Sequence, residues 1–148
     1  MATIAPIIHV YDVDATVAYY RDVLGFEVDW VIGHDGSGRN TFASVNWFGA
    51  TLKFVDPGEP VSDVARSLLG AGMAFSFEDS LIDIDRYYGE LKARGVDIIL
   101  EIADQPSGHR SFHIRDLNGY HLAFSLERAA PVSADGPWAV VSGRAGGG

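Results

Sequence analysis

Hydrophobic and polar residues alternate in two stretches of the chain, Ile8-His-Val-Tyr-Asp12 and Met73-Ala-Phe-Ser-Phe-Glu-Asp79. A period of two predicts a strand with one buried face. Immediately after each stretch, apolar residues recur every three or four positions, as in an amphipathic helix. This spacing predicts helices over residues 13–24 and 81–94, on the positions Val13, Val17, Tyr20 and Leu24, and Leu81, Ile84, Tyr88 and Leu91.

The two halves of the chain share further landmarks, which indicate an internal duplication. Each helix contains a Tyr-Tyr pair and leads into a glycine, and the two glycines, Gly25 and Gly95, are 70 residues apart. The same offset separates Gly49 from Gly119. Each half is therefore predicted to fold as β-α-β-β-β, with strands over residues 4–11, 26–33, 40–47 and 50–55, and then over 72–78, 97–102, 109–115 and 120–126.

The repeat defines the expected domain organisation. We expect one α+β domain over residues 1–127, in which modules at 4–56 and 72–127 are joined by a linker, 57–71. Within the linker, residues 62–69 favour one or two helical turns capped by Ser62, because a serine hydroxyl can accept the free N–H groups of a helix start. Residues 128–148 form a C-terminal tail rich in Gly, Ala, Pro and Ser, in which 137–141 could lie against the domain as a short strand.

Composition and charge narrow the function. The chain has 148 residues and a formal net charge of −9, which argues against a nucleic-acid partner and weakly favours a cationic ligand. It contains no cysteine, and this excludes disulfides, thiolate nucleophiles and Cys-ligated metals. Neither a signal peptide nor an apolar membrane-spanning stretch is visible, so we expect a cytoplasmic protein without a membrane partner.

Two segments carry a resemblance to a known family. They are Asp-Val-Asp-Ala-Thr-Val-Ala-Tyr-Tyr-Arg-Asp-Val-Leu-Gly-Phe at 12–26 and Arg-Ser-Phe-His-Ile-Arg-Asp-Leu-Asn-Gly-Tyr-His-Leu at 110–122. Together with the duplication, they resemble the vicinal oxygen chelate superfamily of glyoxalase I, extradiol dioxygenases, and fosfomycin- and bleomycin-resistance proteins. The resemblance covers about residues 4–126. It implies two tandem βαβββ modules that form a cup-shaped mixed sheet, with helices outside and the ligand inside.

The resemblance also implies where a metal would be held. Enzymes of the family bind a divalent metal at four strand positions, which correspond here to Ala5, Lys53, Gly72 and Ala123. Three of these residues have no donor atom in the side chain, and a lysine would bring positive charge to a cation. The resemblance therefore implies the fold without a metal or other cofactor. An alternative is a displaced site formed by His9, His113 and His121, in which case the chain is a metal-dependent lyase, isomerase or dioxygenase.

Strand alternation assigns side chains to the two faces of the predicted sheets. Ile8, Val10, Phe75, Phe77, Phe112 and Ile114 should face the helices, and the polar residues between them should face the cup. Trp30, Trp47 and Phe48 should lie near the rim, where large rings suit a flat aromatic ligand. We expect no catalytic residue, and the candidate ligand-binding residues are His9, Tyr11, Trp30, Trp47, Phe48, Thr51, Lys53, Ser76, His113, Arg115 and His121.

These observations favour a metal-free binding protein that sequesters an aromatic natural product, such as an antibiotic to which its host must be resistant. The displaced-metal enzyme is one alternative, and an interaction module with a filled cup is another. Because open sheet edges and a concave face must be covered, we expect a homodimer with two equivalent cups, with or without exchanged strands.

Overall fold

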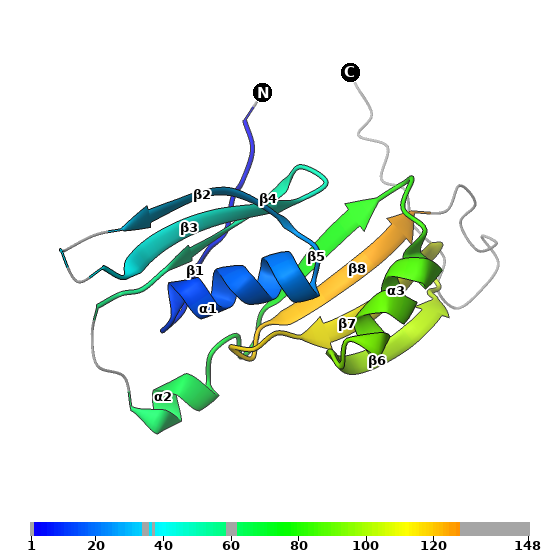
Figure 1. Cartoon of the computed structure of the whole chain (residues 1–148). Coiled ribbons are helices and arrows are strands. Elements are labelled where there is room, and N and C mark those ends of the chain that lie inside the picture. The colour runs from blue at the N-terminus through cyan, green and yellow to red at the C-terminus, as the bar shows by residue number, and fades with distance from the viewer. Residues whose placement is uncertain (1, 34–35, 37, 59–61, 128–148) are drawn as a thin grey trace, which may run out of the picture.

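The computed structural model of the chain describes residues 2–33, 36, 38–58 and 62–127. The C-terminal tail, with its segment 137–141, lies outside the described residues. Two four-stranded sheets stand side by side in Figure 1, with strand orders β1-β4-β3-β2 and β5-β8-β7-β6. In the described part of the chain, no helix is long and apolar enough to cross a membrane.

The first module forms the first sheet and packs one helix against it. Its strand β1 pairs in parallel with β4, whereas β2, β3 and β4 pair antiparallel. A π-helical segment, η1, continues the helix α1 to the residue before Leu24. The elements are β1 (Ile7–His9), α1 (Val13–Ala18), η1 (Tyr19–Val23), β2 (Glu27–Gly33), β3 (Asn40–Trp47) and β4 (Ala50–Val55).

The second module repeats this arrangement, with β5 parallel to β8 and with helix α3 against the second sheet. A short helix, α2 (Asp63–Ser67), lies in the linker between the modules. The elements of the second module are β5 (Ala74–Asp79), α3 (Ile84–Ala93), β6 (Asp97–Asp104), β7 (His109–Arg115) and β8 (His121–Glu127). The α+β fold of two βαβββ modules is therefore confirmed.

Two elements begin later than predicted, one beside a proline and the other at a capping residue. The first strand is shorter than residues 4–11, because Pro6 has no N–H to donate and contributes only its carbonyl, which accepts Lys53 N at 2.9 Å. Helix α3 begins at Ile84 rather than residue 81, since the Asp83 side chain caps it by accepting the N–H of Arg86 at 3.1 Å. The predicted cap of α2 is present: Ser62 Oγ accepts Ala65 N at 3.2 Å.

The helix-facing sides of both sheets meet in one hydrophobic core. The ring of Phe26 lies 5.3 Å from that of Phe77, and the ring of Trp47 lies 5.3 Å from that of Phe124, so side chains of the first module pack directly on the second sheet. The predicted inward set is buried, except Phe75, which is half-buried. Because the helix sides of the sheets are used for this contact, the opposite face of each sheet points outward.

Hydrogen bonds also join the modules. The buried hydroxyl of Tyr20 donates to Asp116 Oδ2 at 2.7 Å, across 96 residues of chain. Asp116 Oδ1 accepts the backbone N–H groups of Asn118 at 2.9 Å and Tyr120 at 2.8 Å, which shapes the turn between β7 and β8. The Tyr120 hydroxyl donates to the carbonyl of His9 at 2.7 Å. These hydrogen bonds therefore fix the β7–β8 turn of the second module against the first module.

Candidate ligand-binding site

The first open face, the side of the first sheet away from α1, carries an apolar pocket of about 600 Å³. Alternation along the strands puts Leu52 and Phe54 in the core and therefore turns Val55 to this face. Phe42 lies opposite Val55 in the β3–β4 register. The pocket is lined by Ile7, Thr41, Phe42, Val55, Asp56, Pro57 and Gly58. Ile7 is 55% exposed, so this apolar surface is open to solvent in a single chain.

A tryptophan and a lysine extend the pocket along the same face. The Trp30 ring packs edge-on against the Phe42 ring, with 4.9 Å between centroids. Lys53 Nζ lies 5.8 Å from the centre of the Trp30 ring. Among the described residues, Lys53 has no carboxylate within ion-pair distance. This part of the face thus offers two aromatic rings and one cation to a ligand.

A carboxylate on the neighbouring strand is held by strand side chains. Asp29 accepts hydrogen bonds from Ser44 Oγ at 2.9 Å and from Asn46 Nδ2 at 2.6 Å. It lies where the β2–β3 register shifts between Val28 and Trp30. Among the described residues, this carboxylate forms no ion pair with Lys53. Neither Asp29 nor Phe42 was among the predicted site residues: Asp29 lies at the bulge in β2, and Phe42 is placed by its pairing with Val55.

The second open face, the side of the second sheet away from α3, carries a histidine pair. His113 Nδ1 lies 2.7 Å from His121 Nε2, a hydrogen bond whose direction depends on the tautomer. The contact is diagonal, since His113 is opposite Ala123 and His121 is opposite Arg115. The sequence predicts this diagonal from a turn over 116–120, and it is confirmed. Burial, followed by the neighbouring His121, lowers the pKa of His113, so His113 favours the neutral state.

Comparison with known proteins identifies the family. The family model described as "Glyoxalase/Bleomycin resistance protein/Dioxygenase superfamily" matches residues 3–124. The chain belongs to this superfamily. The match spans both modules, in agreement with the resemblance of segments 12–26 and 110–122. Among curated proteins, none matches the chain significantly.

Solved structures of the superfamily share the fold. TioX from Micromonospora sp. ML1 is similar with a TM-score of 0.65 and 23% identity, over 86% of this chain and 100% of TioX. The bleomycin-binding protein from Streptomyces verticillus, complexed with copper(II)-bleomycin, has a TM-score of 0.61 and 23% identity, over 86% of this chain and 98% of the bleomycin-binding protein. A glyoxalase-related enzyme from Clostridium phytofermentans has a TM-score of 0.64 and 22% sequence identity, over 86% of this chain and 96% of that enzyme. At these identities, the likeness is one of fold.

The donor set does not fit the divalent metal that enzymes of the superfamily hold. Ala5, Gly72 and Ala123 have no side-chain donor, and Lys53 is a cation above a tryptophan ring. The alternative histidine set is divided, because His9 lies on the first sheet while His113 and His121 lie on the second. In the described ranges, no three His, Cys, Asp or Glu side chains are grouped so that they could hold a metal ion.

The candidate residues of this superfamily member fall into two groups. His9, Trp30, Thr51 and Lys53 belong to the first sheet, and Ser76, His113, Arg115 and His121 to the second. Tyr11 follows β1, where its ring lies 4.9 Å below the guanidinium of Arg66. Since the two open faces point outward, one chain does not bring the two groups together around one ligand.

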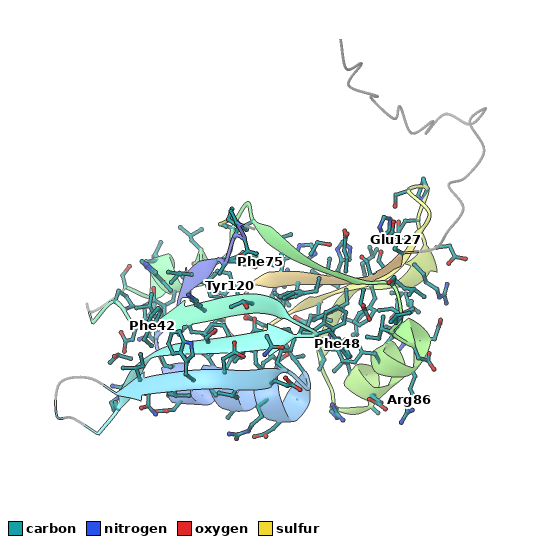
Figure 2. The ribbon with its side chains drawn as sticks, turned by 90° about the horizontal axis from the view of Figure 1, so that it is seen from above. Phe42, Phe48, Phe75, Arg86, Tyr120 and Glu127 are labelled. Carbon is teal, nitrogen blue, oxygen red and sulfur yellow. The ribbon has the colours of Figure 1, made fainter. Side chains whose placement is uncertain are left out.

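Trp47 and Phe48 lie apart from both groups. Trp47 is 3% exposed and packs in the core against Phe77, Tyr87 and Phe124, on the same side of β3 as Val45. Phe48 occupies the β3–β4 turn, is 73% exposed and has a φ of 47°, a value that a bulky residue rarely adopts. Figure 2 shows Phe42 and Phe48 toward opposite ends of the first sheet. Of the three rim aromatics, only Trp30 borders the apolar pocket.

Proposed function

We propose that this superfamily member is a metal-free binding protein that sequesters an aromatic natural product, such as an antibiotic. The observation that carries the proposal is the apolar pocket of about 600 Å³ on the first open face, next to the Trp30 and Phe42 rings. Its size lies in the range of about 300–1,000 Å³ that is typical of small-molecule sites. Aromatic rings offer large rigid contact areas that suit flat ligands.

The polar groups around the pocket suit orientation of a ligand rather than chemistry. Lys53 stands beside the rings, and the ring nitrogens of the His113–His121 pair can donate or accept hydrogen bonds according to their tautomers. Affinity would come from burial of apolar surface and ring contacts, at about 25 cal/mol per Å² buried. Sequestration needs no reacting group, and such a protein protects its host by lowering the free concentration of the compound.

A second copy of the chain would complete the site. Each open face is half of a cup, and the shared core on the helix sides leaves both faces on the outside of one chain. A two-fold axis that set the first open face of one chain against the second open face of its partner would place Trp30 and Lys53 opposite the histidine pair, twice in the dimer. It would also cover Ile7. A homodimer with two equivalent cups therefore follows from the proposal.

The structural neighbours support a role in binding a small molecule, but they do not identify the ligand. The bleomycin-binding protein from Streptomyces verticillus has the same fold and is complexed with copper(II)-bleomycin. Because the identity is 23%, its ligand is not transferred to this chain. Two observations support the proposal. Binding proteins share this fold. At the four positions where the superfamily's enzymes hold a metal, this sequence has Ala5, Gly72 and Ala123, which have no side-chain donor, and the cation Lys53.

A thermal-shift screen of EDTA-treated full-length protein against aromatic antibiotics tests the proposal. A ligand at one hundred times its Kd stabilises the folded state by about 2.7 kcal/mol. The shift should be lost in Trp30→Ala and retained in Leu81→Ala, a matched control that removes an exposed apolar side chain on the connection before α3. If binding requires added metal, or if Trp30→Ala keeps the full shift, the proposal is wrong.

A further inference from the structure

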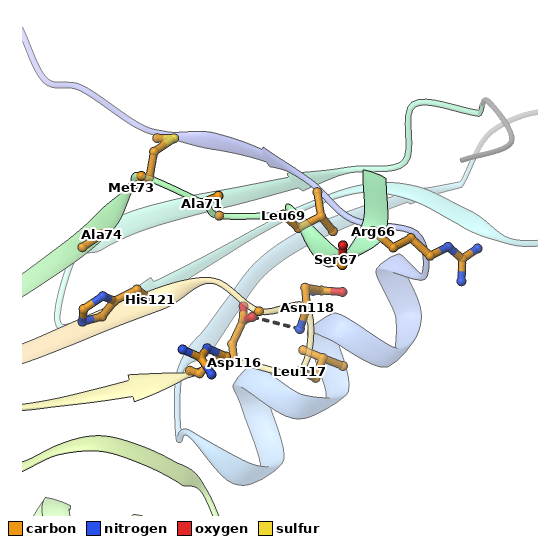
Figure 3. A pocket seen from close by; sticks show the side chains of 14 residues that line it. Arg66, Ser67, Leu69, Ala71, Met73, Ala74, Asp116, Leu117, Asn118 and His121 are labelled. Carbon is orange, nitrogen blue, oxygen red and sulfur yellow. Dashed lines mark hydrogen bonds between the residues drawn. The ribbon is translucent and has the colours of Figure 1, made fainter. Parts of the chain in front are cut away.

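A second cavity, of about 770 Å³, lies at the edge of the second open face. The end of the linker borders it on one side, and the turn between β7 and β8 borders it on the other (Figure 3). Ala74 and His121, neighbours in the parallel β5–β8 register, connect it to that face. We call it the linker pocket, and its lining residues are Arg66, Ser67, Leu69, Gly70, Ala71, Gly72, Met73, Ala74, Arg115, Asp116, Leu117, Asn118, Gly119 and His121.

The charged groups of the linker pocket are mostly basic. Arg66 and Arg115 line it together with the imidazole of His121, and Asp116 is the sole acid among these described residues. The Asp116 carboxylate is not available, because it is buried and accepts from the Tyr20 hydroxyl and from two backbone N–H groups. The lining therefore offers an incoming anion the Arg115 guanidinium and no competing free carboxylate, while Arg66 borders the outer end of the pocket (Figure 3).

Among the described residues, neither guanidinium donates a hydrogen bond to a carboxylate, and Arg115 has only a long, exposed ion pair with Asp97. Arg115 Nη1 lies 3.9 Å from Asp97 Oδ2, which is too long for a hydrogen bond. Arg66 stacks on the ring of Tyr11 at 4.9 Å, and this contact leaves the edge of its guanidinium plane available for hydrogen bonds. Guanidinium forks match the geometry of a carboxylate or a phosphate. The pocket thus has the donors that an anionic group needs.

The histidine pair can add one more donor. The bond to His113 uses Nε2 of His121 and leaves Nδ1 as the remaining ring nitrogen of His121. When His113 donates in this bond, a neutral His121 carries its own proton on Nδ1 and can donate it. An anion in the pocket would select this tautomer, so the pair adapts to an anion without a change in net charge.

At one end of the linker pocket, Gly70 of the linker packs closely against Gly119 and Tyr120 of the β7–β8 turn. Gly70 has a φ of +74°, and a Cβ at this position would lie 2.9 Å from the Tyr120 ring and 3.1 Å from the Gly119 carbonyl oxygen. The linker is therefore pressed directly against the β7–β8 turn, and only glycine fits. Because Tyr120 is in turn bonded to the His9 carbonyl, both walls of the pocket are anchored to the domain core.

We propose that the linker pocket binds an anionic group, a carboxylate or a phosphate, of the molecule whose rings are held on the open faces. The inference rests on the proposed function, and it adds the chemical class of the ligand. It also reverses the expectation from the net charge of −9, because the local charge that a ligand meets at this pocket is positive.

Binding of 1-naphthoate and of its neutral isostere 1-naphthamide to the full-length protein tests the proposal, followed by NMR of the arginine Nε–H, histidine and Trp30 indole signals. Naphthoate should bind at least about tenfold more tightly, should shift the Arg115 and His121 signals, and should weaken when salt is raised. Arg115→Gln should reduce its affinity to that of naphthamide. Arg86→Gln, a control on the exposed face of α3, should leave both affinities unchanged.

Equal affinities for the two compounds, an unchanged naphthoate affinity in Arg115→Gln, or naphthoate binding without a shift of Arg115 would each overturn the anion site. If the Trp30 signal still shifts equally with both compounds, the anion site fails while aromatic binding stands. If neither compound shifts Trp30, Arg115 or His121, the anion site is refuted, and the antibiotic screen decides the proposed function separately.

Discussion

Removal of one hydroxyl group tests how the two modules are held together. In Tyr20→Phe the ring still fills the core, but Asp116 loses the donor that lies 2.7 Å from its Oδ2. A hydrogen bond to a charged group contributes about 1.5–3 kcal/mol, and the carboxylate keeps its backbone donors. We therefore expect Tyr20→Phe to lower the free energy of unfolding by about 2 kcal/mol in urea denaturation at neutral pH.

The pH dependence sharpens this prediction. Burial raises the pKa of Asp116, while the Tyr20 hydroxyl and backbone donors lower it. A raised pKa in the folded state means that the ionised carboxyl costs stability above that pKa, and this cost is relieved as pH falls through it. Loss of the hydroxyl raises the pKa further. The penalty of Tyr20→Phe should therefore be larger at about pH 7.5 than at about pH 4.5.

Tyr88→Phe is the matched control for the hydroxyl. Tyr88 occupies the corresponding position of the second Tyr-Tyr pair, and within the described ranges its hydroxyl has a single, exposed hydrogen bond, with Lys92 Nζ at 3.2 Å. Its loss should change stability by no more than about 0.5 kcal/mol. Our reasoning is refuted if Tyr20→Phe is as mild as this control, or if its penalty is the same at both pH values.

Three further outcomes are expected. Phe77→Ala should cost about 3–5 kcal/mol in urea denaturation by opening a cavity in the core, whereas His9→Ala should cost less than about 1.5 kcal/mol; equal costs would mean that the strand faces are misassigned. Acidification through about pH 6.5 should lower the free energy of unfolding, because the folded state holds the pKa of His113 below that value, and His113→Gln should flatten this slope. Light scattering at high micromolar concentration should give twice the 16.0 kDa of one chain, and a monomeric mass would contradict the dimer.

The fold could be predicted in detail because its signals are local and repeated. Strand alternation assigned Ile8, Phe77 and Phe112 to the core, and the structure buries all three. The same rule places Trp47 in the core beside Val45, whereas the predicted position of Trp47 was at the rim, where a large ring suits a flat aromatic ligand. Periodicity was the better guide at this position, because it reports the face of the strand directly.

The site was harder to predict, since it depends on register and on how the modules meet. Phe42 lines the apolar pocket through its position opposite Val55, and Trp30 reaches it only because β2 shifts register after Val28. The repeat indicates two sheets, but it does not say whether their open faces meet within one chain. That arrangement is decided by core contacts such as Phe26 on Phe77, which join residues far apart in the sequence.

The most direct test of metal-free binding is a calorimetric titration of a compound found in the screen, before and after extensive dialysis against EDTA. Elemental analysis of the same samples should find far less than one equivalent of zinc, manganese, iron, nickel or copper per chain. We predict that the Kd of the dialysed protein is unchanged within about twofold, because the superfamily's metal positions hold Ala5, Lys53, Gly72 and Ala123. Stoichiometric metal whose removal abolishes binding or turnover would contradict the account and favour the enzyme.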